Sequence, residues 1–161
     1  MYSNKLVCKI LNYIDKNINN KISINDLENI FFYNRYYIMK LFKKEIKLSI
    51  IEYINSLRVY NCILDIKNKN NTFMNIALKN GFYSLEYFSE IFKQITKSSP
   101  RKFKYYFLRK TNISQNDIEL INKSIIKLHE ISKIKNNYLN KQEPITYPVK
   151  KLSIFNKKTM L

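Results

Sequence analysis

The side chains of this sequence that could do chemistry are mainly cationic. The chain carries 29 lysine and arginine residues against 12 acidic ones, which gives a net charge of +17. Such an excess favours binding to an anionic partner, such as nucleic acid or a membrane surface. Asparagine, isoleucine and lysine dominate the composition, as is typical of an AT-rich coding sequence. The charge alone therefore does not decide what the partner is.

Groups suited to catalysis or metal binding are few and scattered. His129 is the only histidine, and Cys8 and Cys62 lie far apart without a C-x-x-C pattern. Gly81 is the only glycine, so no glycine-rich loop can cradle a phosphate. We therefore expect no catalytic residue, no metal site and no cofactor, in a protein that is not an enzyme.

We expect neither a membrane span nor a secretion signal. No apolar run approaches the roughly 18 residues needed to cross a bilayer. The first residues carry polar side chains at helical spacing and lack the apolar core of a signal peptide. A reduced, cytoplasmic protein is expected.

Polar caps, rather than glycine and proline, divide the chain into helices. Ser23 with Asp26, and Ser49 with Glu52, have the spacing of a capping box, in which the hydroxyl accepts from a backbone N–H three residues on. Further N-cap positions, one of them followed by a proline at the first helical position, are Asn34, Thr72, Ser84 and Ser99–Pro100. These signals predict about seven helices, over residues 4–18, 24–31, 35–46, 50–67, 73–80, 85–96 and 100–107.

Part of this pattern occurs twice, at an offset of 50 residues. The segments 32–49 and 82–99 share an aromatic pair, a cap, a tyrosine, a Phe-Lys pair, a lysine and a second cap. Each copy reads as a short helix, a tight turn and a capped second helix. This is the helix-turn-helix pattern.

The single glycine lies at the turn of the second copy. Gly81 follows a short helix containing Ile76-Ala77 and precedes Phe82, which is expected to enter the core. Glycine accepts a positive φ at the end of a helix because it has no Cβ. If Gly81 stood alone, a plain helix stop with no role in DNA binding would be the favoured explanation. The repeat and the neighbouring helices favour the helix-turn-helix instead.

Two stretches carry a resemblance to a known family. The segment NIALKNGFYSLEYFSEIFKQITKSSPRKF, residues 75–103, and the helix IIEYINSLRVYNCILDI, residues 50–66, resemble the DNA-binding region of AraC/XylS bacterial transcription regulators. The resemblance covers about residues 4–107. It implies an all-α fold in which a long bridging helix joins two helix-turn-helix subdomains. We expect a DNA-binding domain over 1–107 and a C-terminal extension over 108–161.

The chain departs from the family pattern at several turns. Phe31 stands where the first copy commonly has glycine, and Lys47 and Lys97 stand where a glycine often follows Phe-Lys. A left-handed residue other than glycine costs about 1 kcal/mol. Cys62 replaces a common alanine and is expected to be a small buried side chain. These changes keep the fold and predict modest stability.

The second helix of each copy has one apolar face. Ile38, Leu41 and Phe42 in the first copy, and Phe88, Ile91 and Phe92 in the second, recur at helical spacing and should face the core. Tyr37 and Tyr87 are also expected in the core, with their hydroxyls reaching the surface. The outward positions are Arg35, Tyr36, Met39, Lys40 and Lys43 in the first copy and Leu85, Glu86, Ser89, Glu90 and Lys93 in the second. The resemblance implies that they contact bases and phosphates, while Gly81, Ser84, Asn34, Pro100 and Arg58 are structural.

The segment beyond residue 107 lies outside the resemblance. Ile118, Ile121, Ile125 and Leu128 predict an amphipathic helix over about 115–138, whose apolar face needs a partner. That partner is either the DNA-binding region itself or a second subunit. Pro144 and Pro148 predict an extended tail.

The leading functional hypothesis is a sequence-specific, double-stranded-DNA-binding transcription regulator, an activator by family analogy. RNA polymerase is a candidate second partner, no membrane is expected, and the protein should be a monomer or weak dimer. The alternative is a nonspecific DNA-binding or protein-interaction module that retains the fold. A membrane-surface protein is a third hypothesis, which rests on the tail helix alone.

Overall fold

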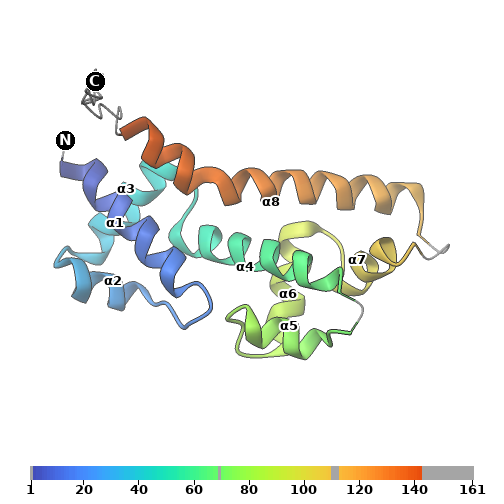
Figure 1. Cartoon of the computed structure of the whole chain (residues 1–161). Coiled ribbons are helices and arrows are strands. Elements are labelled where there is room, and N and C mark those ends of the chain that lie inside the picture. Colours follow the sequence, from blue (N-terminus) through green and yellow to red (C-terminus); the bar gives the residue numbers. More distant parts are fainter. Residues whose placement is uncertain (1, 69, 110–112, 143–161) are drawn as a thin grey trace, which may run out of the picture.

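The computed structural model describes residues 2–68, 70–109 and 113–142, and within these residues the chain is entirely helical (Figure 1). The helices are α1 (Tyr2–Asn17), α2 (Ile24–Phe31), α3 (Arg35–Ile46), α4 (Ile50–Ile66), α5 (Phe73–Lys79), α6 (Leu85–Thr96), α7 (Pro100–Phe107) and α8 (Gln115–Gln142). The all-α class and the helices expected from the caps are confirmed. The tail helix is longer than expected, and the proposed extended segment around Pro144 and Pro148 lies outside the described residues.

The helices begin where the capping residues predict. The Ser23 hydroxyl accepts from the Asp26 amide at 3.1 Å while the Asp26 carboxylate accepts from the Ser23 amide at 2.8 Å. Ser49 and Glu52 form the same reciprocal pair at the start of α4. These hydrogen bonds satisfy amides that have no partner within the helix, and they lower the pKa of the Asp26 and Glu52 carboxyls.

The helices form two units on either side of α4. In the first unit α2 and α3 pack together against α1, and in the second α5 and α6 pack together with α7 beside them (Figure 1). Helix α4 runs between the units, and α8 lies along it. One buried apolar cluster extends through both units and includes Ile121, Leu128 and Ile131 of α8. The apolar face of the tail helix is therefore covered by the preceding helices of the same chain.

Arg58 of α4 and Gly81 join the two units. Arg58 is buried, with 8% of the residue exposed. It donates to the carbonyls of Ile18 at 2.9 Å and Asn20 at 2.6 Å, both in the loop between α1 and α2. Gly81 has a φ of +83°, and a Cβ there would lie 2.8 Å from the Ile18 carbonyl oxygen and 3.0 Å from Arg58 Nε. Gly81 therefore does more than end α5, because it lets the second unit approach the first.

The first turn, where Phe31 replaces the common glycine, differs from the second. Phe31 is the last residue of α2 and packs edge-on against Tyr13, with ring centroids 6.1 Å apart. Phe32 takes the left-handed conformation instead, with a φ of 57°. Its side chain is 90% exposed, whereas Phe82, its match in the repeat, is buried. In the repeat Gly81 corresponds to Phe31, but the left-handed residue of the first turn is Phe32. The two turns therefore differ in backbone conformation.

The lysines that replace glycine behave as expected. Lys47 and Lys97 adopt φ values of 68° and 59°, directly after α3 and α6 respectively. Their amides donate to the carbonyls of Lys43 at 3.0 Å and Lys93 at 2.8 Å. Each helix end thus stores the strain of a left-handed residue that carries a Cβ.

We expect Gly81→Ala to lower the free energy of unfolding by about 1–3 kcal/mol, because it adds both left-handed strain and a close contact with the Ile18 carbonyl. The control is Lys97→Gly, which relieves strain at another left-handed position and should stabilise by up to about 1 kcal/mol. Thermal and urea denaturation followed by circular dichroism measure both changes. An unchanged melting temperature for Gly81→Ala would show that the two units do not depend on this contact.

Candidate nucleic-acid interface

Each unit presents one helix whose start is fixed by a side-chain cap. The Asn34 side chain accepts from the Tyr36 amide at 2.9 Å, and the Ser84 hydroxyl accepts from the Tyr87 amide at 3.1 Å. The capped helices α3 and α6 follow the turns of the two helix-turn-helix units. We call them the recognition helices, because in this motif the second helix enters the major groove of DNA.

The outward face of α3 is exposed and basic. Ile38, Leu41, Phe42 and Ile46 are buried in the core, which turns the opposite face to solvent. That exposed face carries Arg35, Tyr36, Met39, Lys40 and Lys43, as the spacing predicts. The Arg35 guanidinium lies over the Tyr36 ring, 5.4 Å from its centroid. Within the described residues Arg35, Lys40 and Lys43 form no ion pair, so their charges are available to an anionic partner.

The outward face of α6 has a different chemistry. Glu86, Glu90 and Lys93 are exposed, and Ser89 is half-buried. Leu85 is also half-buried and packs against the core, so its expected outward position is wrong in part. In the part of the chain that the structure describes, neither Glu86 nor Glu90 forms an ion pair with a cation. The two recognition helices are therefore unequal, one basic and one carrying two unpaired carboxylates.

Stacked tyrosines flank each turn, and the sequence reasoning missed them. Tyr33 stacks on Tyr37 with ring centroids 5.6 Å apart, and Tyr83 stacks on Tyr87 at 4.6 Å. Tyr37 is 46% exposed, so its expected place in the core is wrong, while Tyr87 is half-buried against the core. The i, i+4 spacing of the two pairs in both copies of the repeat is the signal that could have found them.

The structural residues of the sequence analysis lie where the turns need them. Gly81 and Arg58 meet between the units, Asn34 and Ser84 cap the recognition helices, and Pro100 occupies the first turn of α7 behind the Ser99 cap. Cys62 is fully buried, and burial raises the pKa of its thiol. It is thus a packing residue, as expected.

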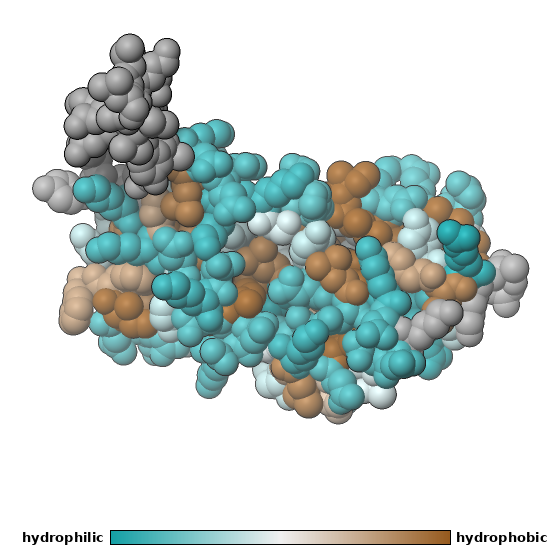
Figure 2. Space-filling view, viewed as in Figure 1, coloured by the Kyte–Doolittle hydropathy of each residue, from teal (hydrophilic) through white to brown (hydrophobic). Residues whose placement is uncertain are grey.

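Other kinds of site find little support among the described residues. No group of three or more histidine, cysteine, aspartate or glutamate side chains is placed to hold a metal ion there. Of the described helices, none is both long and apolar enough to cross a bilayer. Figure 2 shows that the visible face is mainly hydrophilic, with hydrophobic residues in separate patches.

The sequence is similar to known regulators over much of its length. The helix-turn-helix domain family matches residues 27–105. The uncharacterized HTH-type transcriptional regulator YbfP of Bacillus subtilis strain 168 is 28% identical over 112 residues, which are 70% of this chain and 38% of that protein. The HTH-type transcriptional activator AarP of Providencia stuartii is 25% identical over 120 residues, which are 74% of this chain and 85% of that protein. The chain therefore spans less than two thirds of the length of YbfP and most of the length of AarP.

Solved structures share the fold. The C-terminal domain of AraT, a response regulator from Geobacillus stearothermophilus, superposes with a TM-score of 0.59 at 21% identity, covering 68% of this chain and 88% of that one. A Listeria innocua protein of unknown function superposes with a TM-score of 0.57 at 28% identity, covering 61% of this chain and 93% of that one. Residues 27–105, which contain both capped recognition helices, thus match the helix-turn-helix domain family, and the chain is similar to HTH-type transcriptional regulators.

Proposed function

We propose that this chain is a sequence-specific, double-stranded-DNA-binding transcription activator that inserts α3 and α6 into successive major grooves. The observation that carries the proposal is the pair of capped, outward-facing recognition helices held in one folded body, the first of them with unpaired cations. The names of two relatives support the step to activation. AarP is a transcriptional activator, and AdaA of Bacillus subtilis strain 168, 30% identical over 59% of this chain, is a bifunctional transcriptional activator and DNA repair enzyme.

The spacing between the units suits two successive grooves. Helix α4 has 17 residues, and at 1.5 Å per residue it is about 26 Å long. One turn of DNA is about 34 Å, and the packed bodies of the two units make up the difference. A monomer would then contact one face of an asymmetric site. Contact with RNA polymerase is the further step that activation requires.

The residues of α3 supply most of the affinity in this proposal. Arg35, on the first turn, can donate two hydrogen bonds to guanine O6 and N7. Tyr36 and Met39 offer apolar contact to thymine methyl groups. Lys40 and Lys43 extend the same face toward phosphates, where each contact releases counterions and strengthens binding at low salt.

In this proposal the residues of α6 contribute more to the choice of DNA sequence than to the affinity for DNA. Leu85, Ser89 and Lys93 are candidates for base or phosphate contacts, whereas Glu86 and Glu90 place negative charge near a polyanion. A carboxylate there either accepts from cytosine N4 or repels phosphate. We favour repulsion for Glu90, because it lies a turn into the helix with no arginine beside it to orient it.

The unpaired carboxylates of α6 also support a second candidate function. A protein that binds DNA nonspecifically, or that docks another protein through α6, would tolerate them. The membrane-surface hypothesis has lost its motivating feature, because Ile121 and Leu128 of α8 are buried against the rest of the chain.

Selection from a random duplex pool with the purified chain tests the proposal. We expect an enriched site bound about 1,000-fold or more tightly than random DNA. The logarithm of its binding constant should fall with log salt by about 0.9 for each phosphate contact. A specificity ratio near one would favour the nonspecific candidate, and a flat salt response would contradict DNA binding altogether.

Arg35→Ala should cost about 1–3 kcal/mol on the enriched site and relax the preference at one base pair. Lys40→Ala should weaken binding as well, through a base or a phosphate. The control is Lys9→Ala, which removes an exposed charge from α1. Fluorescence anisotropy titrations measure all three variants. If both α3 variants bind like the control, the proposed outward face of α3 does not face DNA.

Glu90→Ala should tighten enriched and random DNA alike, and most at low salt, where the repulsion is least screened. Glu119→Ala, which removes an exposed carboxylate from α8, is the control for net charge. The same titrations, repeated at two salt concentrations, measure the effect. Weaker binding to the enriched site with random DNA unchanged would instead assign Glu90 to the reading of a cytosine.

A further inference from the structure

Helix α8 lies beyond the family match and spans both helix-turn-helix units. It has 28 residues against the 17 of α4, so at 1.5 Å per residue it is about 16 Å longer. It packs along α4 and extends to α1 in the first unit and to α6 and α7 in the second (Figure 1). The units are therefore joined through α8 as well as through α4 and through the contact of Arg58 and Gly81 with the loop between α1 and α2.

At the second unit, α8 contacts the end of the recognition helix. The Ser124 hydroxyl lies within hydrogen-bonding distance of two carbonyls, that of Thr96, the last residue of α6, at 2.9 Å and that of Leu120 in α8 at 2.8 Å. The buried Thr96 hydroxyl in turn donates to the Phe92 carbonyl at 2.8 Å. Asp117 pairs with Lys102 of α7 at 2.7 Å. The C-terminal end of α6 is thus held on α8.

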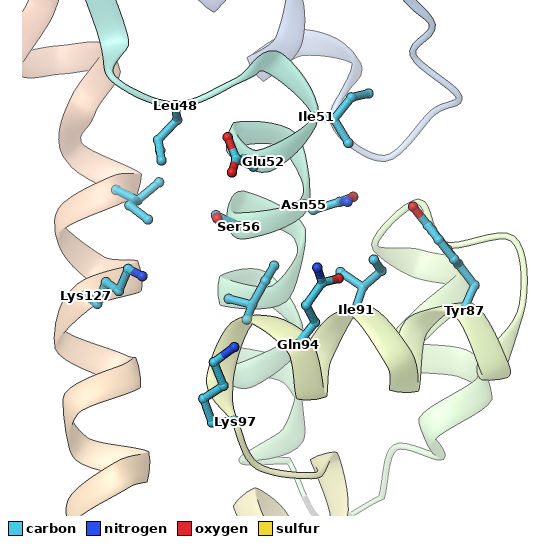
Figure 3. Close-up of a pocket in the computed structure, with 12 residues that line it drawn as sticks. Leu48, Ile51, Glu52, Asn55, Ser56, Tyr87, Ile91, Gln94, Lys97 and Lys127 are labelled. Carbon is cyan, nitrogen blue, oxygen red and sulfur yellow. The ribbon is translucent and has the colours of Figure 1, made fainter. Parts of the chain in front are cut away.

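The rest of α6 runs away from α8. Figure 3 shows Lys97 at the end of α6 nearer to α8 and Tyr87, near the start of α6, farther from it. A groove of about 410 Å³ lies between the two helices and α4, lined in part by Asn55, Gln94 and Lys127. Because α6 is held near its C-terminal end, its exposed N-terminal half is left open to a partner.

At the first unit, α8 contacts the end of the other recognition helix. The Tyr138 phenol donates to the carboxylate of Glu45, in the last turn of α3, at 3.3 Å. Burial and the nearby Glu45 raise the pKa of Tyr138, so its phenol stays neutral and able to donate. Lys135 pairs with Asp15 of α1 at 2.7 Å. The two recognition helices are therefore held by the same helix, each at its C-terminal turn.

We propose that α8 is a strut that fixes the separation of α3 and α6 and so makes half-site spacing a determinant of DNA specificity. This inference rests on the proposed function. One base pair moves the second half-site by about 3.4 Å and turns it by about 35°. A packed interface does not deform continuously to follow such a change. With only α4 and the Arg58–Gly81 contact between them, the units could bend about that one region. Helix α8 joins them again alongside α4 and so resists both bending and twisting.

The test frees one end of the strut. Lys135→Ala/Tyr138→Ala removes both polar contacts to the first unit and leaves the buried Ile121 and Leu128 in place. Lys133→Ala/Asn137→Ala changes exposed positions on the same turns, with the same loss of charge, and is the matched control. Both are titrated against the enriched duplex and against versions with one base pair added or removed between the half-sites.

We expect the parent and the control to lose about 10–100-fold in affinity when the spacing changes. The freed variant should bind the unchanged site about 3–10-fold more weakly, because it must order the two units on binding, and should vary less than about 3-fold across the three spacings. Partial unfolding alone would weaken all three duplexes by the same factor. A freed variant that keeps the parent's spacing preference, or a parent without one, would overturn the proposal.

A measurement without DNA separates this inference from the proposed function. Spin labels at Asn29→Cys in α2 and Met74→Cys in α5, both exposed positions, report the distance between the units in a Cys8→Ser background. The distance distribution should be narrow in the parent and the control and broader in the freed variant. Equal widths would overturn the strut even if DNA binding is specific. If the distribution broadens in the freed variant but the protein prefers no duplex sequence, the proposed function is contradicted. The role of α8 in fixing the distance between the units would still be supported.

Discussion

The arrangement of both units depends on a buried guanidinium. Arg58 is nearly enclosed, and a buried charge is costly unless its hydrogen bonds are satisfied. The carbonyls of Ile18 and Asn20 provide that satisfaction from the first unit. The Phe82 ring of the second unit lies 6.0 Å from the same group. The contact therefore involves the loop between α1 and α2, Arg58 of α4 and the ring of Phe82. Because Gly81 has no side chain, these three parts can come close enough for the two units to share one core.

The helices were predictable because their signals are local. A cap such as Ser49 and its partner Glu52 lie three residues apart, so the sequence contains the whole interaction. The apolar faces of α3 and α6 follow in the same way from helical spacing, which is why the exposure of Arg35 and Glu90 was expected correctly. Interactions within one or two turns leave few alternatives for the chain to adopt.

The errors arise where distant segments decide the outcome. Phe31 packs against Tyr13 of another helix, and the left-handed conformation lies at Phe32. Tyr37 stacks on Tyr33 at the surface, although spacing alone allows a place in the core. The partner of α8 stayed open for the same reason, since an amphipathic helix does not specify what covers its apolar face. The sequence predicted Gly81 as a turn residue. It did not predict that Gly81 lies against the Ile18 carbonyl and Arg58.

The contacts of α8 with the first unit join residues far apart in the sequence. Lys135 meets Asp15 across 120 positions, and Tyr138 meets Glu45 across 93. Each helix-turn-helix unit closes through short-range contacts, which form fastest, whereas contacts of high sequence separation form late. During synthesis the first unit emerges well before the helix that will lie against it. The order of assembly therefore completes the two helix-turn-helix units first and adds the contacts of α8 with the first unit last.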